Sequence, residues 1–299
     1  MKKHIIIPVA ILLILTLWFM GGSEDLPEVE NSSSGIPQRV ISINPAATEI
    51  LFELGCQGRL VAVSDFCNYP AEVKDFEKVG GATGHNFERI ARLAPDLVIF
   101  QGAGEDMVKF CRDRNIRTVS INLRNVGEVY DGIKQLGGLL GLEQEAEQIC
   151  TRISGQFKEI ENKVSSAKKK KVFFSFFRTP GSLAGITTVG PKTCLSELLV
   201  RAGGVNIFDD VSQDYTVISK ESLLKRQPDV VIEPYAIFSD FEKDTSQALK
   251  DWGKLDALNA VSNRRIHFID PDLVLKPGPR VAQAAMELAK IIHPELFSE

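Results

Sequence analysis

A long amphipathic stretch in the middle of the chain, residues Glu143 to Ser166, constrains the fold more than any other feature. Its apolar residues recur at steps of three or four, the spacing that places side chains on one face of an α-helix. They are Ala146, Ile149, Cys150, Ile153, Phe157, Ile160 and Val164. At about 1.5 Å per residue the stretch spans roughly 36 Å, which is enough to connect two domains. An ordinary surface helix has the same periodicity, so the connecting role depends on the flanking segments.

The segments on either side of this stretch resemble each other. Residues 86–99 (NFERIARLAPDLVI) and 219–232 (SKESLLKRQPDVVI) each begin with a helix N-cap residue and end in Pro-Asp and an apolar strand. Matching residues such as Glu88 and Glu221 lie 133 positions apart. Unrelated helix–loop–strand segments share the same start and stop signals and can produce one such match. A constant offset on either side of a central helix favours two similar α/β lobes.

Strand-like and helix-like segments alternate along both halves, which is typical of parallel sheets covered by helices. We therefore predict an α/β fold of two similar Rossmann-like lobes with mostly parallel sheets, joined by one long α-helix. The predicted boundaries are a signal peptide at 1–23, a flexible tether at 24–37, an N-terminal lobe at 38–142, a linking helix at 143–167 and a C-terminal lobe at 168–299. The expected strands are 39–43, 60–64, 96–100, 117–121, 172–176, 229–233 and 265–269. The expected helices, besides the linker, are 46–54, 87–93, 105–114, 126–140, 194–202, 220–227, 244–252 and 278–292.

The N-terminus has the pattern of an export signal. Lys2 and Lys3 precede an apolar run from Ile5 to Met20, and small residues follow it. Export predicts a periplasmic protein, with an uncleaved N-terminal membrane anchor as the alternative. Removing residues 1–23 takes away two lysines and no acid, which lowers the net charge from −4 to −6. An acidic chain of this kind argues against nucleic acid as the partner.

The sequence contains none of the usual catalytic signatures. It has no phosphate-binding loop, no dinucleotide-binding glycine motif and no nucleophile elbow. The histidines outside the leader, His85, His267 and His293, are scattered, so we predict neither a catalytic site nor a metal site. The five cysteines are odd in number, lack a C-x-x-C motif and lie mostly at apolar positions, which favours buried thiols. A pairing of Cys56 with Cys67 stays open.

Several motifs resemble the substrate-binding proteins of ABC importers for cobalamin and ferric siderophores. They are residues 39–55 (RVISINPAATEILFELG), 63–70 (VSDFCNYP), 79–93 (VGGATGHNFERIARL), 95–100, 190–208 (GPKTCLSELLVRAGGVNIF), 218–229 and 277–280 (PGPR). The resemblance covers essentially everything after the tether, and the segment SDFCNYP followed by VGG is closest to the cobalamin branch. Such proteins bind their ligand between two lobes that one long helix bridges.

The resemblance implies a set of ligand contacts. In the family pattern the cobalamin contacts fall on Phe66, Tyr215 and Asp272, and Ala82 replaces a further aromatic. Tyr69, Tyr235 and Phe238 lie on loops that we expect after strands, where α/β proteins form their pockets, and aromatic side chains there suit a large flat ligand.

The resemblance also gives Glu88 and Glu221 a role. In the family, an acid at this position on each lobe docks against arginines of the membrane permease. The alternative is that each Glu only stabilises the positive end of its helix, and both roles are compatible. One acid on each half of the chain suits a permease dimer with two equivalent faces.

We therefore expect a monomeric binding protein and not an enzyme, with no cofactor of its own. It would capture cobalamin, a metal chelate, and deliver it to the permease dimer of an ABC importer. A ferric siderophore or haem is the alternative ligand, which cationic pocket residues would favour; the candidates are Arg178, Lys192, Lys276 and Arg280. An exported enzyme or a membrane-tethered sensor with the same fold is the third hypothesis.

Overall fold

The computed structural model describes residues 35–81, 84–102, 104–235 and 245–298. The predicted leader and all but the last three residues of the predicted tether lie outside these ranges. The chain divides into two compact units. The N-terminal unit contains residues up to Asn122 together with Tyr130–Ile149, and the C-terminal unit contains Leu123–Val129 together with Cys150 onward.

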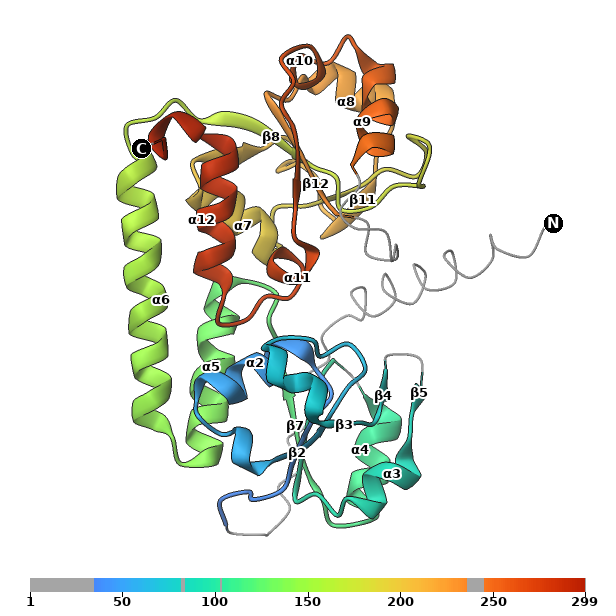
Figure 1. Cartoon of the computed structure of the whole chain (residues 1–299), viewed down its shortest axis with the longest axis vertical. Helices are drawn as coiled ribbons and strands as arrows, with labels where there is room; N and C mark the ends of the chain where they lie inside the picture. The colour runs from blue at the N-terminus through green and yellow to red at the C-terminus, as the bar shows by residue number, and fades with distance from the viewer. Residues whose placement is uncertain (1–34, 82–83, 103, 236–244, 299) are drawn as a thin grey trace, which may run out of the picture. The chain divides into compact units, whose positions relative to one another are not determined.

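The N-terminal unit is built on a five-stranded parallel sheet in the order β3-β2-β1-β6-β7. Helices cover both of its faces, as the predicted alternation requires (Figure 1). The strands are β1 (Val40–Ser42), β2 (Leu60–Val63), β3 (Glu77–Lys78), β6 (Leu97–Gln101) and β7 (Arg117–Ile121). The helices of this part of the chain are α2 (Pro45–Glu53), α3 (Phe87–Arg92), α4 (Glu105–Arg112) and α5 (Val126–Leu140).

Alternation of side chains along the strands explains which residues form the core of this unit. Ile41 of β1, Ala62 of β2 and Val98 of β6 lie in one buried cluster with Ile90 of α3 and Cys111 of α4. Successive side chains of a strand point to opposite faces, so one face of the sheet packs against α3 and α4. Those two helices lie together on one side of the sheet in Figure 1.

The C-terminal unit repeats this design with a four-stranded parallel sheet in the order β10-β8-β12-β13. A short antiparallel ladder of β9 and β11 accompanies it. The strands are β8 (Lys170–Phe174), β9 (Thr187–Val189), β10 (Gly204–Asn206), β11 (Tyr215–Val217), β12 (Val230–Pro234) and β13 (Ile266–Ile269). The helices are α7 (Cys194–Arg201), α8 (Lys220–Arg226), α9 (Ser246–Trp252), α10 (Asn259–Ser262), α11 (Pro271–Val274) and α12 (Val281–Ile292). The predicted α/β class with two lobes is confirmed.

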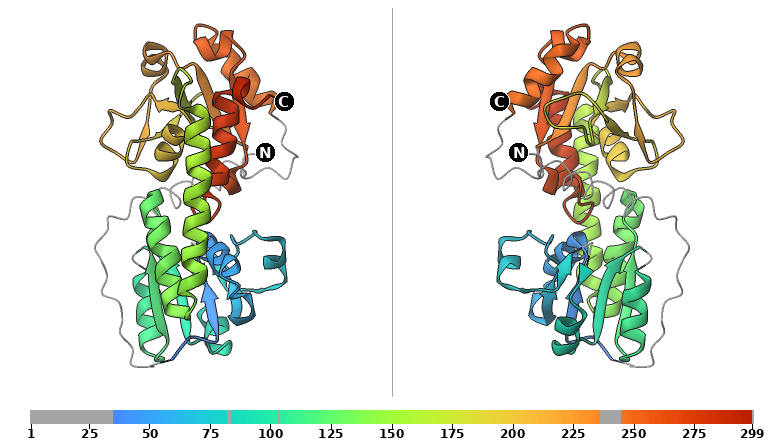
Figure 2. Two further views of the ribbon diagram at one scale, coloured as in Figure 1. Left: turned by 90° about the vertical axis from the view of Figure 1, so that its left-hand side faces the viewer. Right: turned by 90° about the vertical axis from the view of Figure 1, so that its right-hand side faces the viewer.

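The predicted long helix is α6, which runs without interruption from Glu143 to Val164 (Figure 2). All seven residues of its apolar stripe are buried, with exposed fractions of 8% or less. Its first residues belong to the N-terminal unit and the rest to the C-terminal unit. Helix α5 is divided in the same way, because its first turn groups with the C-terminal unit. There the Glu197 carboxylate accepts a 3.0 Å hydrogen bond from the Val126 backbone N–H.

The repeated Pro-Asp motif has the same structural role in both units. Asp96 accepts hydrogen bonds from the backbone N–H groups of Gln38 (2.7 Å) and Arg39 (2.9 Å), just before β1. Asp229 accepts one from the backbone N–H of Lys171 (2.8 Å) in β8. Each Asp therefore fixes the start of the strand beside its own.

Several elements were not predicted. The two-residue strands β3, β4 (Gly80–Gly81) and β5 (Gly84–His85), the short β9, β10 and β11, and the one-turn helices α10 and α11 carry too few residues to show a periodicity. Strand β8 begins two residues before the expected 172–176, because Lys170 and Lys171 pair with Gly204 and Val205 of β10. No helix in the described ranges is both long and apolar enough to cross a membrane.

Candidate ligand-binding site

The predicted aromatics of the N-terminal unit lie on the loop that follows β2. Phe66 and Tyr69 are 51% and 45% exposed, which is unusual for large apolar side chains. Cys67, between them, is buried, and its thiol lies 3.2 Å from the hydroxyls of Thr48 and Ser64. The loop thus presents two aromatic rings outward on either side of a buried anchor.

The neighbouring strand segment also holds this loop. The Lys78 ammonium donates to the carbonyl of Cys67 at 2.8 Å, and the backbone N–H of Asp65 donates to the carbonyl of Gly80 at 3.0 Å. The Phe66 ring rests against Gly81, where an added Cβ would lie only 2.7 Å from the ring. Only glycine permits this close approach.

Tyr215 is the predicted aromatic of the β9–β11 ladder in the C-terminal unit. It is half-buried, and its ring centroid lies 4.8 Å from that of Phe176. Burial, and then the charge of the neighbouring Asp214, raise the pKa of the Tyr215 phenol. The phenol therefore stays neutral at physiological pH.

Tyr235 and Asp272 follow the adjacent strands β12 and β13, so the structure brings them to the same edge of one sheet. The Tyr235 backbone N–H donates to the Ile269 carbonyl at 2.9 Å. The Tyr235 ring stacks on that of Phe268, with the two centroids 6.1 Å apart. Asp272 lies in the first turn of α11, with its backbone N–H bonded to the Asp270 side chain at 2.9 Å. The carboxyl edge of a parallel sheet is where α/β proteins bind ligands. The predicted positions Ala82 and Phe238 lie outside the described residues.

Arg178, a candidate for binding an anionic chelate, is instead a buried structural residue. Its guanidinium is 2.9 Å from the Glu233 carboxylate and 3.0 Å from that of Asp251. It also donates to the carbonyl of Ser182, and the Trp252 indole N–H donates to Glu233 at 2.7 Å. Two carboxylates neutralise this cation, because an unpaired charge is costly at such depth. The expectation that it faces a ligand was wrong.

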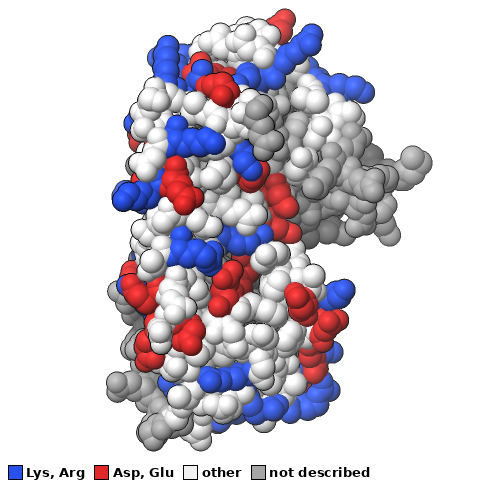
Figure 3. Space-filling view, turned by 60° about the vertical axis from the view of Figure 1, so that its left-hand side comes forward, with Lys and Arg blue, Asp and Glu red and all other residues white. Residues whose placement is uncertain are grey.

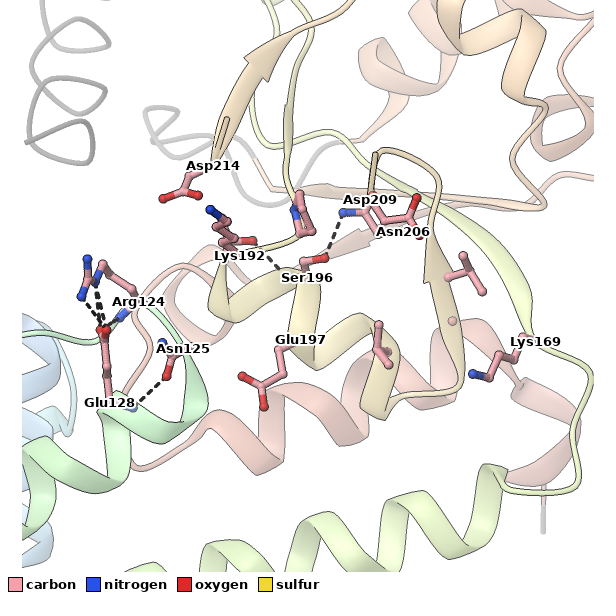
Figure 4. A pocket seen from close by; sticks show the side chains of 15 residues that line it. Arg124, Asn125, Glu128, Lys169, Lys192, Ser196, Glu197, Asn206, Asp209 and Asp214 are labelled. Carbon is pink, nitrogen blue, oxygen red and sulfur yellow. Dashed lines mark hydrogen bonds and ion pairs between the residues drawn. The ribbon is translucent and has the colours of Figure 1, made fainter. Parts of the chain in front are cut away.

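The other candidate cations have defined surroundings in the C-terminal unit. Lys276 forms a 2.5 Å ion pair with Asp272, and Arg280 donates to the Asp272 carbonyl at 2.9 Å. Lys192 lies on the wall of a groove beside α7 and β10 (Figure 4), and Asp272 is not among the residues that line this groove.

This groove has a volume of about 860 Å³ and combines both signs of charge. Arg124 and Glu128 pair across its rim at 2.8 Å, and the Asn206 amide donates to the Ser196 hydroxyl at 3.0 Å (Figure 4). Of the sequence-predicted ligand residues, the candidate cation Lys192 lines the groove, but none of the predicted aromatic residues does, nor does Asp272.

Glu88 and Glu221 occupy equivalent positions in two short helices. Each is the second residue after a capping side chain, Asn86 of α3 or Ser219 of α8, and each is exposed. Hydrogen bonds from its own backbone N–H and from Ser219 lower the pKa of the Glu221 carboxyl, so it is charged at neutral pH. On the face drawn in Figure 3, acidic and basic side chains are interspersed.

The described histidines and cysteines form no cluster that could hold a metal ion. No group of three or more His, Cys, Asp and Glu in the described ranges could hold a metal ion. All five cysteines are buried free thiols, which confirms the prediction, and the open Cys56–Cys67 pair is not bonded. Burial raises the pKa of Cys111 and Cys194 to about 12, so both stay protonated and unreactive.

Sequence reasoning missed two residues that shape the site. Lys78 lies in a two-residue strand, and nothing in its local sequence indicates that its ammonium holds a loop eleven positions away. Gly81 had a weak signal, since a glycine pair beside a strand often marks a close backbone approach.

Comparisons with known proteins agree on the type of molecule. The sequence profile of a family described as periplasmic binding protein matches residues 40–273. A protein of Bacillus subtilis (strain 168), the uncharacterized ABC transporter substrate-binding lipoprotein YvrC, is 31% identical over 272 residues, 88% of this chain and 82% of that protein. A vitamin B12-binding protein of Vibrio campbellii is 29% identical over 261 residues, 86% of this chain and 90% of that protein.

Solved structures share the fold. The periplasmic haem-binding protein HutB of Vibrio cholerae superposes with a TM-score of 0.77, covering 86% of this chain and 99% of that protein. The sequences are 22% identical, so the likeness concerns the fold and not the ligand.

Proposed function

Because the chain belongs to the periplasmic binding protein family, whose members include substrate-binding proteins of ABC importers, we propose that it captures cobalamin. Export by residues 1–23 would place it in the periplasm. We propose that it acts there as a monomer. It would deliver the ligand to the permease dimer of an importer and catalyse no reaction. The proposed contacts are Phe66 and Tyr69 of the N-terminal unit and Tyr215, Tyr235 and Asp272 of the C-terminal unit.

The charge balance of the C-terminal unit is the observation that carries the choice of ligand. Arg178 is neutralised by the buried Asp251 and the largely buried Glu233, and Lys276 is paired with Asp272. Haem carries propionates, and many ferric siderophores are anionic, so either would favour cations that are not already compensated. Cobalamin has a large corrin ring edged with neutral amides. Aromatic rings and hydrogen-bonding groups without surplus positive charge suit it better.

The exposed aromatics support the same choice. Phe66 and Tyr69 expose about half of their surface on a loop fixed by Cys67 and Lys78. Covering the exposed half of one such ring is worth roughly 1 kcal/mol, about half the value for full burial, and a fixed loop loses little entropy when a ligand binds. A flat ligand that covers both rings is therefore a physical reason for keeping them exposed.

Glu88 and Glu221 support delivery to a two-subunit permease. They are exposed acids at the same helix position in two similar units, and neither is in an ion pair within the described residues. Unpaired acids of this kind suit a partner with two equivalent basic faces and would orient the encounter electrostatically.

Calorimetric titration of single-site variants tests the proposed ligand site. Residues 24–299 keep every helix and strand that the structure describes. We expect one-to-one cyanocobalamin binding that weakens about tenfold or more in Phe66→Ala, Tyr215→Ala and Asp272→Ala. Leu249→Ala removes an exposed apolar side chain of α9 and should bind as the unmodified chain does.

Two outcomes would refute the site or the ligand. Equal affinity in all four variants would show that the ligand binds elsewhere. Binding of haemin or a ferric siderophore without cyanocobalamin would keep the transport function and change the ligand.

A further inference from the structure

The segment Glu77–Gly81 lies between the loop that carries Phe66 and Tyr69 and the helix that carries Glu88. Its first two residues form β3, which extends the sheet beside β2. Its last two residues form β4. It therefore touches both of the features to which we assign function in the N-terminal unit.

Three contacts join this segment to the ligand loop. The Lys78 ammonium donates to the carbonyl of Cys67 at 2.8 Å, and the Gly80 carbonyl accepts from the Asp65 backbone at 3.0 Å. The Phe66 ring lies against Gly81 so closely that a methyl group would not fit. A ligand that changes the position of the Phe66 ring would therefore also displace this segment.

A second set of contacts joins the same segment to α3. The Lys78 carbonyl accepts a hydrogen bond from the Arg89 guanidinium, and the Val79 carbonyl accepts one from the Asn86 backbone at 2.9 Å. Arg89 also lies 3.3 Å from the Glu77 carboxylate. Asn86 caps α3, and Arg89 directly follows Glu88, so these bonds fix the turn that presents Glu88.

Lys78 is the residue where the two sets of contacts meet. Its side chain holds the ligand loop, while its own carbonyl is held by α3. It is half-buried and forms no ion pair within the described ranges, so its charge is compensated by carbonyl dipoles of Cys67 and, at 3.5 Å, Val73. An ammonium that is directed at carbonyls with no carboxylate partner is suited to positioning a loop.

We propose that Lys78 is a positioning residue that couples ligand binding on the Phe66–Tyr69 loop to the order of α3 and its docking residue Glu88. This inference rests on the proposed function. Coupling between two sites needs contiguous contacts, which the segment supplies, and it must be reciprocal. A ligand on the loop stabilises α3, and a permease that holds α3 changes the affinity of the loop for ligand. The permease can thereby distinguish loaded from empty protein.

Hydrogen exchange measured by mass spectrometry on the ligand-free chain gives the first test. Lys78→Met removes the ammonium and keeps the carbonyl that Arg89 holds, so a local effect would reach only residues 65–69. We expect faster exchange at residues 86–93 as well, by about fivefold or more, the lower end of typical coupling between sites. Arg89→Gln should in turn speed exchange at residues 65–69.

Two further variants separate coupling from simple damage. Arg92→Gln removes another guanidinium of α3 that pairs with Glu77 but does not touch Lys78, and it should leave residues 65–69 unchanged. Lys78→Arg keeps a donor for the Cys67 carbonyl, so residues 86–93 should exchange as slowly as in the unmodified chain. This variant keeps the proposal testable if Lys78→Met folds poorly.

The second test adds cyanocobalamin at saturation. Exchange at residues 86–93 should slow in the unmodified chain and in Arg92→Gln, and the slowing should disappear in Lys78→Met. Binding without any change in α3, or a change that survives in Lys78→Met, would overturn the coupling and leave the proposed function intact. Failure to bind cyanocobalamin would refute the proposed ligand, and the ligand-free exchange would then be the test of the contact between Lys78 and α3.

Discussion

At the scale of single residues, Arg178 shows how burial changes the meaning of a charge. A cationic side chain after a strand suggested an anion-binding role, but its guanidinium lies between Glu233 and Asp251 and is 7% exposed. These partners are 55 and 73 positions away in the sequence, so local pattern could not reveal them. The loop position of Phe66 and Tyr69 could be predicted, because the expected strand at 60–64 ends just before them.

Replacing Arg178 with Met should destabilise the C-terminal unit. Removal of the guanidinium leaves the buried Asp251 with Lys254 and Gln247 as partners and the largely buried Glu233 with the Trp252 indole, at a cost of about 3 kcal/mol. Urea unfolding followed by the fluorescence of Trp252, the only tryptophan in residues 24–299, reports on this unit. Lys254→Met removes a more exposed partner of Asp251 and should cost less than about 1 kcal/mol. Equal stability of Arg178→Met and the unmodified chain would contradict the account.

The same network predicts a dependence on pH. Burial opposes ionisation of Asp251, but hydrogen bonds from Lys254, Gln247 and Arg178 outweigh it and lower the pKa. A carboxyl whose pKa is lower in the folded state stabilises the fold above its unfolded value of 3.8 and loses that contribution as the pH falls below it. The stability difference between the unmodified chain and Asp251→Asn should therefore shrink in acid.

At the scale of elements, the repeated Pro-Asp motif shows which part of a fold a sequence can reveal. The strands that follow it were expected within one residue of β6 and β12, because apolar runs after Pro-Asp are long enough to recognise. Strand β10 and the ladder of β9 and β11 have three residues each, and long-range pairing defines them. Period-two alternation needs more residues than these strands contain.

Replacing the repeated Asp residues should destabilise the two units to different degrees. Asp96 accepts two backbone hydrogen bonds and Asp229 one, and a typical bond contributes about 1 kcal/mol. Urea unfolding should show a loss of about 2 kcal/mol in Asp96→Ala and about 1 kcal/mol in Asp229→Ala. Asp113→Ala, at an exposed helix end, should change stability by less than about 0.5 kcal/mol. A larger loss in Asp229→Ala would refute the shared role.

At the scale of the whole molecule, the two-lobed fold and its α6 helix could be predicted from one periodic stretch and one repeat. The ligand could not be predicted from these two features, because the conformation of the loops that would contact it depends on long-range contacts such as that of Lys78 with Cys67. Glu88 and Glu221 are equivalent because each occupies the same helix position in its own unit, which the repeat of the two units explains.

Charge reversal tests the docking role of these acids. Glu88→Arg and Glu221→Arg should each weaken binding to the cognate permease about tenfold or more, because a like charge then faces the basic partner. Ligand affinity of the isolated protein should not change. Glu105→Arg reverses a third exposed acid in the first turn of a helix, α4, and should bind the permease normally. Undiminished docking in both variants would rule out the role.

Calorimetric titration of residues 24–299 with cyanocobalamin, beside haemin and a panel of ferric siderophores, tests the central claim most directly. We predict tight one-to-one binding of cyanocobalamin and weak or no binding of the anionic chelates, because the cations Arg178 and Lys276 are already paired. A clear haemin or siderophore isotherm without cyanocobalamin heat would contradict the choice of ligand. Silence across the panel would contradict the binding function itself.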